Sequence, residues 1–187
     1  MKFLLVALLL VISQLLVPAP APAAGEARID EVVVTNSSRD VLLYFQVRDA
    51  ITPEMEEGVR NGLPLSITFL VELHRHRAGW PDQRLVNLEF NHRLSYDNLK
   101  DEYRILREEL GERTTVTASL IEARQLLNRV SGLTVVPLAE LTPEQVYTLR
   151  IKARMGERSS PAFFSRLLPF RRLWSFETDW YSVEFRY

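Results

Sequence analysis

The clearest pattern along the chain is an alternation of apolar and polar residues between Leu63 and Ser95. A stretch of turn-forming residues, 77–82, interrupts it once. The apolar positions before and after this stretch are Leu63, Leu65, Ile67, Phe69, Val71, Leu73, Val86, Leu88, Phe90 and Leu94. A period of two over this length predicts two half-buried antiparallel strands joined as a long hairpin.

Placing the turn at Gly79 and Trp80 fixes the register of this hairpin. Apolar residues then face one another across the strands, as a half-buried hairpin requires. The expected pairs are Leu73 with Val86, Val71 with Leu88, and Phe69 with Phe90. The exception on the apolar face is His92, opposite Ile67, which we expect to be a core histidine satisfied by a neighbouring group.

Shorter alternations predict a first hairpin over 29–48 and strands at 103–107, 114–117, 133–138, 147–155 and the C-terminus, with a bulge or tight turn near Thr178 and Asp179. Two helix starts are expected, one capped by Thr52 and one in the capping box that Ser119 opens. We expect the second helix to run through Val130 and stop at Gly132. Sequential hairpins with two short helices predict a mainly β fold, an antiparallel two-sheet β-sandwich.

The first residues resemble an export signal. Lys2 precedes an apolar run from Phe3 to Val17, which is shorter than the roughly 20 residues of a membrane span. The small residues around Ala21 to Ala23 fit a cleavage site. We therefore expect a signal peptide over 1–23, one sandwich domain over 24–187 and a periplasmic protein. An uncleaved inner-membrane anchor is the alternative.

Composition narrows the classes of function. The net charge of −1 provides no field to attract nucleic acid, and the chain contains no Cys. There is neither a nucleophile elbow nor a glycine-rich phosphate loop. We expect no catalytic activity and no cofactor, although the sequence leaves open a Ser, His and acid set assembled from distant residues.

His74 and His76, with Glu72, lie on one face of a predicted strand, and two His at this spacing can bind Zn²⁺ or Cu²⁺. Because His92 belongs to the opposite face, the obvious third His ligand is missing. A metal-binding protein or enzyme using these residues is therefore the weaker alternative to a solvated strand face.

Two stretches are candidate interaction surfaces. The hairpin tip carries Trp80 beside Arg77, and the segment 161–174 interleaves aromatic and basic side chains. Such a mixture suits a protein interface or a membrane surface, and the alternative is a loop that buries these side chains. The candidate residues of the segment are Phe163, Phe164, Arg166, Phe170, Arg171, Arg172 and Trp174.

The strand over 147–155 carries Arg150, Lys152 and Arg154 on its polar face, with Arg158 beyond it. This basic face could meet an acidic partner or lipid headgroups. We favour an ordinary solubilising face or protection of a sheet edge.

Several short motifs recur in the order of one known family. They are Asn61-Gly62-Leu63-Pro64-Leu65, His74-Arg75-His76-Arg77 with Trp80 and Asp82, Leu94-Ser95-Tyr96 before Tyr103-Arg104, Glu122-Ala123, Leu168-Pro169, Trp174 and Trp180. With these motifs, nearly the whole mature chain resembles a proteobacterial exported family, domain of unknown function 4390. The resemblance implies a periplasmic accessory role near a membrane sensor kinase of the nitrogen-regulation type.

Taken together, these features lead us to expect a non-enzymatic module that binds another envelope protein, with a sensor kinase as one partner. A membrane-surface binder that uses 161–174 is the second hypothesis.

Overall fold

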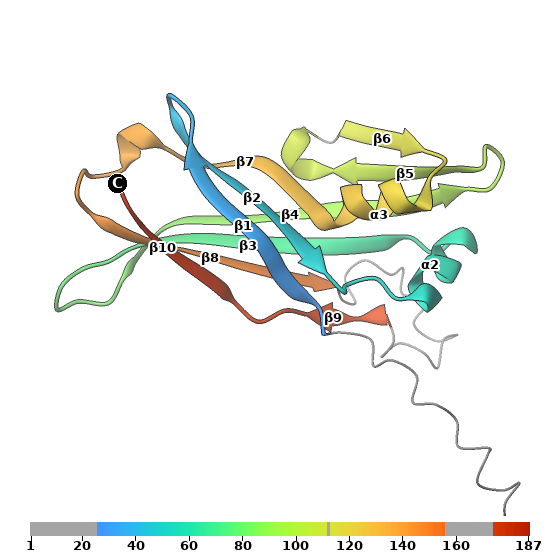
Figure 1. Cartoon of the computed structure of the whole chain (residues 1–187), viewed down its shortest axis with the longest axis horizontal. Helices are drawn as coiled ribbons and strands as arrows, with labels where there is room; N and C mark the ends of the chain where they lie inside the picture. The colour runs from blue at the N-terminus through green and yellow to red at the C-terminus, as the bar shows by residue number, and fades with distance from the viewer. Residues whose placement is uncertain (1–25, 112, 156–173) are drawn as a thin grey trace, which may run out of the picture.

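Two antiparallel sheets pack face to face, which confirms the predicted β-sandwich (Figure 1). The computed structural model describes residues 26–111, 113–155 and 174–187. The smaller sheet crosses one face of the larger one obliquely (Figure 1). Phe45 and Phe69 meet between the sheets with their ring centroids 5.6 Å apart in an edge-to-face arrangement, a geometry that aromatic pairs favour.

The smaller sheet contains three strands in the order β1-β2-β7. β1 (Arg28–Asn36) and β2 (Asp40–Arg48) form the predicted first hairpin, and β7 (Arg129–Pro137) pairs with the other side of β2. A bulge shifts the register of β1 between Asp30 and Val33, where Glu31 has a φ of 51°. This bulge explains why apolar side chains on β1 do not keep a strict period of two.

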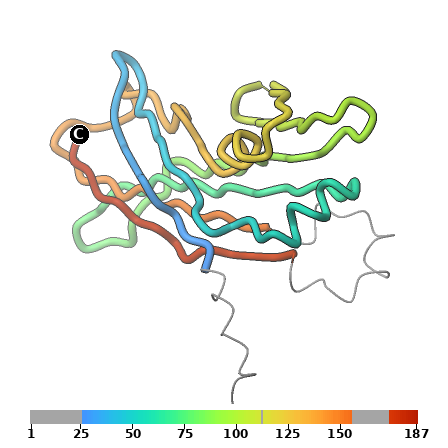
Figure 2. The backbone as a smooth tube through the Cα atoms, turned by 45° about the vertical axis from the view of Figure 1, so that its right-hand side comes forward, coloured from blue at the N-terminus to red at the C-terminus, as the bar shows by residue number. Residues whose placement is uncertain are grey.

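The larger sheet has the order β10-β8-β3-β4-β5-β6, and β9 also pairs with β8. Its centre is the long hairpin, and Figure 2 shows that this hairpin spans much of the molecule. The bounds are β3 (Leu65–Arg75), β4 (Gln83–Asp97), β5 (Glu102–Arg107), β6 (Arg113–Thr117), β8 (Val146–Met155), β9 (Phe176–Glu177) and β10 (Tyr181–Arg186).

The predicted register of the hairpin is confirmed at each expected pair, from Leu73 opposite Val86 to His92 opposite Ile67. The interruption predicted near Thr178 is also present. β9 places Glu177 opposite Arg154, whereas β10 places Tyr181 opposite Ile151. The three residues 178–180 that connect β9 to β10 therefore lie opposite only two residues of β8, 152 and 153.

Two helices and two short 3₁₀ turns complete the described chain. α2 (Pro53–Arg60) has the predicted cap, because the Thr52 side chain accepts a hydrogen bond from the Met55 amide. α3 (Leu120–Asn128) begins at Ser119, whose side chain accepts from the Glu122 amide. The 3₁₀ turns are η1 (Glu108–Leu110) and η2 (Leu138–Glu140). Within the described residues, no helix is long and apolar enough to cross a membrane.

The predicted end of the second helix is wrong. α3 stops at Asn128, and the residues from Arg129 onward enter β7. Val130 pairs with Phe45 in the small sheet and is fully buried there. Gly132 lies in a bulge of β7 with a φ of 71° and therefore does not terminate the helix. Tertiary pairing with β2 overrides the helical periodicity at this point.

Candidate interaction site at the β3–β4 tip

The turn between β3 and β4 is held in one conformation by its own hydrogen bonds. The Trp80 amide donates to the Arg77 carbonyl over 3.1 Å. Arg77 Nε and Nη2 both donate to the Pro81 carbonyl, over 3.1 and 2.9 Å. Gly79 has a φ of 74°, a conformation that favours glycine. The sequence around the turn therefore prescribes a compact loop.

The base of this turn is attached to the strand that neighbours β3. The His76 amide donates to the Val146 carbonyl over 3.0 Å, and Gln145 Nε2 donates to the His76 carbonyl over 2.7 Å. Within the turn, His76 Nδ1 lies 3.1 Å from Asp82 Oδ1. These contacts link the turn to the start of β8, so the tip is an extension of the sheet.

Trp80 is presented to solvent at the end of this support. Its residue surface is 73% exposed, although Trp carries one of the largest apolar side chains. Arg77, whose guanidinium is fixed on the Pro81 carbonyl, is its basic neighbour in the same turn. The structure thus brings together the two tip residues that the sequence proposed.

Glu72 and His74 lie on the polar face of β3, as expected, but His76 does not join them. His74 Nε2 is 2.9 Å from Glu72 Oε2, and Arg84 Nη1 donates to Glu72 Oε1 over 3.2 Å. His76 instead contacts Asp82. Among the described residues, no three His, Asp or Glu side chains are close enough together to hold a metal ion.

The charge state of Glu72 follows from these contacts. Burial alone would raise the pKa of Glu72, but hydrogen bonds from His74 and Arg84 and the positive charge of Arg150 lower it below the usual value. Glu72 is therefore an ionised acceptor at the centre of a structural cluster.

The basic residues of β8 already have partners within the chain. Lys152 Nζ lies 2.5 Å from Glu177 Oε1, and Arg154 Nη2 lies 3.1 Å from Glu89 Oε1. The Arg150 guanidinium lies 4.6 Å from the ring centroid of Trp180, a cation–π geometry. β8 lies between β3 and β10, so the expectation that its charges protect a sheet edge is wrong. The face is a solvated surface whose charges are largely compensated.

His92 is the buried core histidine that the sequence predicted. It is 0% exposed, and its ring lies 4.7 Å from that of Phe69. Nδ1 donates to the Leu127 carbonyl over 2.9 Å, while Nε2 lies 2.9 Å from Glu109 Oε2. Because Nδ1 carries a hydrogen, the second contact needs a further proton, on either Nε2 or the Glu109 carboxyl. The pair fastens η1 and the end of α3 to β4.

Most of the segment 161–174 lies outside the described residues, including Phe163, Phe164, Arg166, Phe170, Arg171 and Arg172. Trp174 is described, and it is half-buried and packed against the core. A Cβ atom at Gly58 of α2 would collide with the Trp174 ring, so the ring occupies the space that the glycine leaves.

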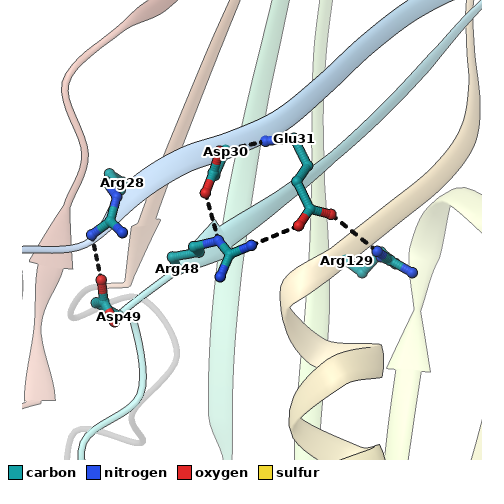
Figure 3. Close-up of polar contacts among 6 residues, drawn as sticks. All are labelled: Arg28, Asp30, Glu31, Arg48, Asp49 and Arg129. Carbon is teal, nitrogen blue, oxygen red and sulfur yellow. Dashed lines mark hydrogen bonds and ion pairs between the residues drawn. The ribbon is translucent and has the colours of Figure 1, made fainter.

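A charged network on the small sheet was missed by the sequence reasoning (Figure 3). Arg48 Nε lies 2.5 Å from Asp30 Oδ2, and its Nη2 lies 2.6 Å from Glu31 Oε1. The other carboxylate oxygen of Glu31 lies 3.2 Å from Arg129 Nη2, and Arg28 pairs with Asp49. The bulge at Glu31 allows one carboxylate to reach both β2 and β7.

The network in Figure 3 compensates its own charges. A hydrogen bond from the Glu31 amide lowers the pKa of Asp30 despite some burial, and the charge of Arg48 lowers it further. Asp30 is therefore an ionised partner of Arg48, and the pairs of Glu31 with Arg48 and Arg129 link three strands. The only sequence signal was the clustering of Asp30 and Glu31 near basic residues, and periodicity alone does not locate a bulge.

The fold and the tip together define a β-sandwich that presents an exposed Trp on a hydrogen-bonded turn. The family model described as domain of unknown function (DUF4390) matches residues 24–184. The chain therefore belongs to the DUF4390 family, which the motifs around the hairpin indicated. Neither a curated protein nor a solved structure matches the chain.

Proposed function

We propose that this protein is an exported, non-enzymatic module that binds another protein of the cell envelope through the β3–β4 tip. The observation that carries this proposal is the 73% exposure of Trp80 on a turn fixed by hydrogen bonds. The partner to test first is the extracytoplasmic part of a membrane sensor kinase, which the family resemblance suggests.

A fixed, exposed Trp favours binding for two physical reasons. Its ring offers a large apolar surface that gains free energy when a partner removes it from water. Trp and Arg are also enriched among the residues that dominate binding energies. Since the turn is already ordered by Arg77 and by Gln145, which immediately precedes β8, little conformational entropy is lost on binding.

The test compares Trp80→Ala with a matched control at another turn. Leu99, in the turn between β4 and β5, is 98% exposed and provides the control variant Leu99→Ala. Immobilised wild-type protein and the Leu99→Ala variant should retain the same envelope proteins from a detergent extract. Trp80→Ala should lose at least one of them while keeping the unfolding midpoint of the wild type.

The partner found in this way is then measured directly with purified components. Removal of a buried Trp from an interface should weaken binding by about 2 kcal/mol or more, a factor of about 30. Equal affinities of the wild type and Trp80→Ala would refute a role for the tip. Arg77→Ala should give a smaller loss, because Arg77 both holds the turn and flanks Trp80.

A membrane-surface binder is the second candidate, and the tip supports it through the same Trp and Arg pair. Flotation with anionic and neutral liposomes separates the two functions. Salt-sensitive binding to anionic vesicles that is lost in Trp80→Ala would favour the membrane. Absence of binding to both kinds of vesicle leaves the protein partner as the function of the tip.

Export is tested by fractionation and by the mass of the purified protein. Cleavage after residue 23 should give a periplasmic protein that starts at Ala24. A full-length protein that sediments with inner membranes would instead support the uncleaved anchor.

A further inference from the structure

β10 is the longer of the two borders of the larger sheet, since β6 pairs with β5 over five residues. β10 pairs with β8 over six consecutive residues without a register shift. The borders of the smaller sheet, β1 and β7, are both interrupted by bulges, which discourage edge-to-edge pairing. Among the described residues, β8 is the only strand paired with β10. An unbroken border of this kind is a template for another strand.

The backbone groups that β10 turns outward can be assigned from its neighbours. The Tyr187 amide donates to the Gln145 carbonyl, so odd-numbered residues bond to β8. The Val146 carbonyl accepts from His76 on the opposite side of β8, which agrees with this alternation. The amides and carbonyls of Ser182, Glu184 and Arg186 therefore point away from the sheet.

We propose that β10 of one molecule pairs antiparallel with β10 of a second copy, with Glu184 opposite the Arg186 of the partner, and joins two large sheets into one. Strand pairing of this kind needs outward-pointing residues opposite one another. Among the registers that satisfy this condition, one places Glu184 of each copy opposite Arg186 of the other copy, so that an oppositely charged pair lies on each side of the two-fold axis. The alternatives place Glu184 opposite itself or opposite Ser182, or Arg186 opposite itself.

The same register also matches side chains on the inner face of the sheet. Phe185 lies on the two-fold axis and faces its own copy, while Val183 faces Tyr187. Phe185 is half-buried and stacks on Tyr147 with centroids 5.7 Å apart, and Tyr187 is exposed. A second copy would cover these partly exposed apolar side chains with its own apolar side chains. An unrelated polar strand would not bury apolar surface in this way.

Little must be broken to form this contact. Arg186 Nη1 lies 3.9 Å from Glu144 Oε2 and donates a long hydrogen bond of 3.4 Å to the Glu144 carbonyl, and both side chains are largely exposed. A loose surface pair of this type contributes little to stability. Arg186 can therefore exchange Glu144 for Glu184 of the second copy. Because the contact involves only short strand segments, the dimer should be weak and concentration-dependent.

The test uses charge reversal on the purified protein, followed by sedimentation equilibrium over a range of concentrations. Glu184→Arg places two positive side chains opposite each other, and Arg186→Glu places two negative ones there. Each variant alone should dimerise at least about tenfold more weakly than the wild type. An equimolar mixture of the two variants should recover the dimer, since opposite charges then face each other at both positions.

Arg113→Glu provides a matched control at the opposite border of the same sheet, on β6, and should leave the dimer unchanged. Circular dichroism checks that all variants keep the wild-type fold, which the exposure of Glu184 and Arg186 favours. A wild type that stays monomeric, single variants that dimerise as the wild type does, or a mixture that fails to recover would each overturn the proposal. Trp80→Ala should dimerise normally, so failure of this proposal is distinct from failure of the tip proposal.

Discussion

The buried contact between His92 and Glu109 offers the sharpest test of how the sandwich is held together. Replacing His92 with Leu places an apolar side chain beside Phe69 and Phe90 but removes both hydrogen bonds of the ring. The Glu109 side chain, which is 3% exposed, then loses its partner in the interior. Stranding one member of a buried ionisable pair costs about 3–5 kcal/mol. A domain of this size is stable by only about 5–15 kcal/mol, so the loss is large.

Two further variants identify the origin of this loss. Glu109→Gln keeps an oxygen that can accept from Nε2, and it should cost about 1 kcal/mol, as for an ordinary hydrogen bond. The double variant His92→Leu with Glu109→Leu removes both polar partners. It should be more stable than His92→Leu alone, because no unpaired carboxyl remains in the interior.

Urea unfolding followed by circular dichroism gives the free energy of each variant from its midpoint and slope. A loss of less than about 1 kcal/mol for His92→Leu, well below the expected range, would refute the structural role of this buried pair. Simple addition, in the double variant, of the losses of His92→Leu and of a separate Glu109→Leu variant would also refute it, since residues in contact should couple.

Variants at three other positions test separate contacts by the same unfolding assay. Gly58→Ala should lower the free energy of unfolding by about 1 kcal/mol and change the fluorescence of Trp174, because the new Cβ displaces its ring although Ala is the better helix former; unchanged fluorescence would contradict this packing. Thr52→Ala should cost about 1 kcal/mol by removing the cap of α2, whereas Thr52→Ser should cost much less. The pKa of Glu72 is lowered in the folded state, so its stabilising contribution is present above the unfolded pKa of about 4.3 and is lost as the pH falls through the folded value. The stability difference between the wild type and Glu72→Gln should therefore shrink below about pH 4, and a constant difference would refute it.

The register of the long hairpin could be predicted from Leu65 to Leu73 because its pattern is redundant, whereas the bulge between Leu73 and His74, which places His74 opposite Arg84, could not. A shift of one position would have turned the whole apolar set, from Leu65 to Leu73, toward solvent. The same argument placed His92 in the core, since its parity matches that of Phe90. The caps at Thr52 and Ser119 were predictable for a similar reason: the bonded atoms lie within three residues of each other.

Features that depend on distant partners could not be predicted. Periodicity states which face of β8 is apolar, but it does not state that β8 lies between β3 and β10. Arg150 and Arg154 consequently suggested an open basic face, although Glu72 and Glu89 approach them from other strands. Val130 followed a helical period, yet pairing with Phe45 decided its conformation.

The candidate site also combines features that the sequence predicts with features that it does not. Trp80 stood out because an aromatic residue in a short polar turn has few apolar neighbours along the chain. The attachment of the tip through Gln145 depends on a contact between distant segments and had no local signal. The role of Glu31 was equally hidden, since one carboxylate serves two strands only where the backbone bulges.

The position of β8 also imposes an order on folding. β3, β4, β5 and β6 follow one another and can pair through short connections early in folding. The second edge of β3 is covered only by β8, where Phe69 meets Ala153. Contacts between such distant segments form slowly, because a long loop must first close. Until β8 has paired with β3, this central strand of the larger sheet therefore has an open edge, and the folding chain is most exposed to aggregation during this period.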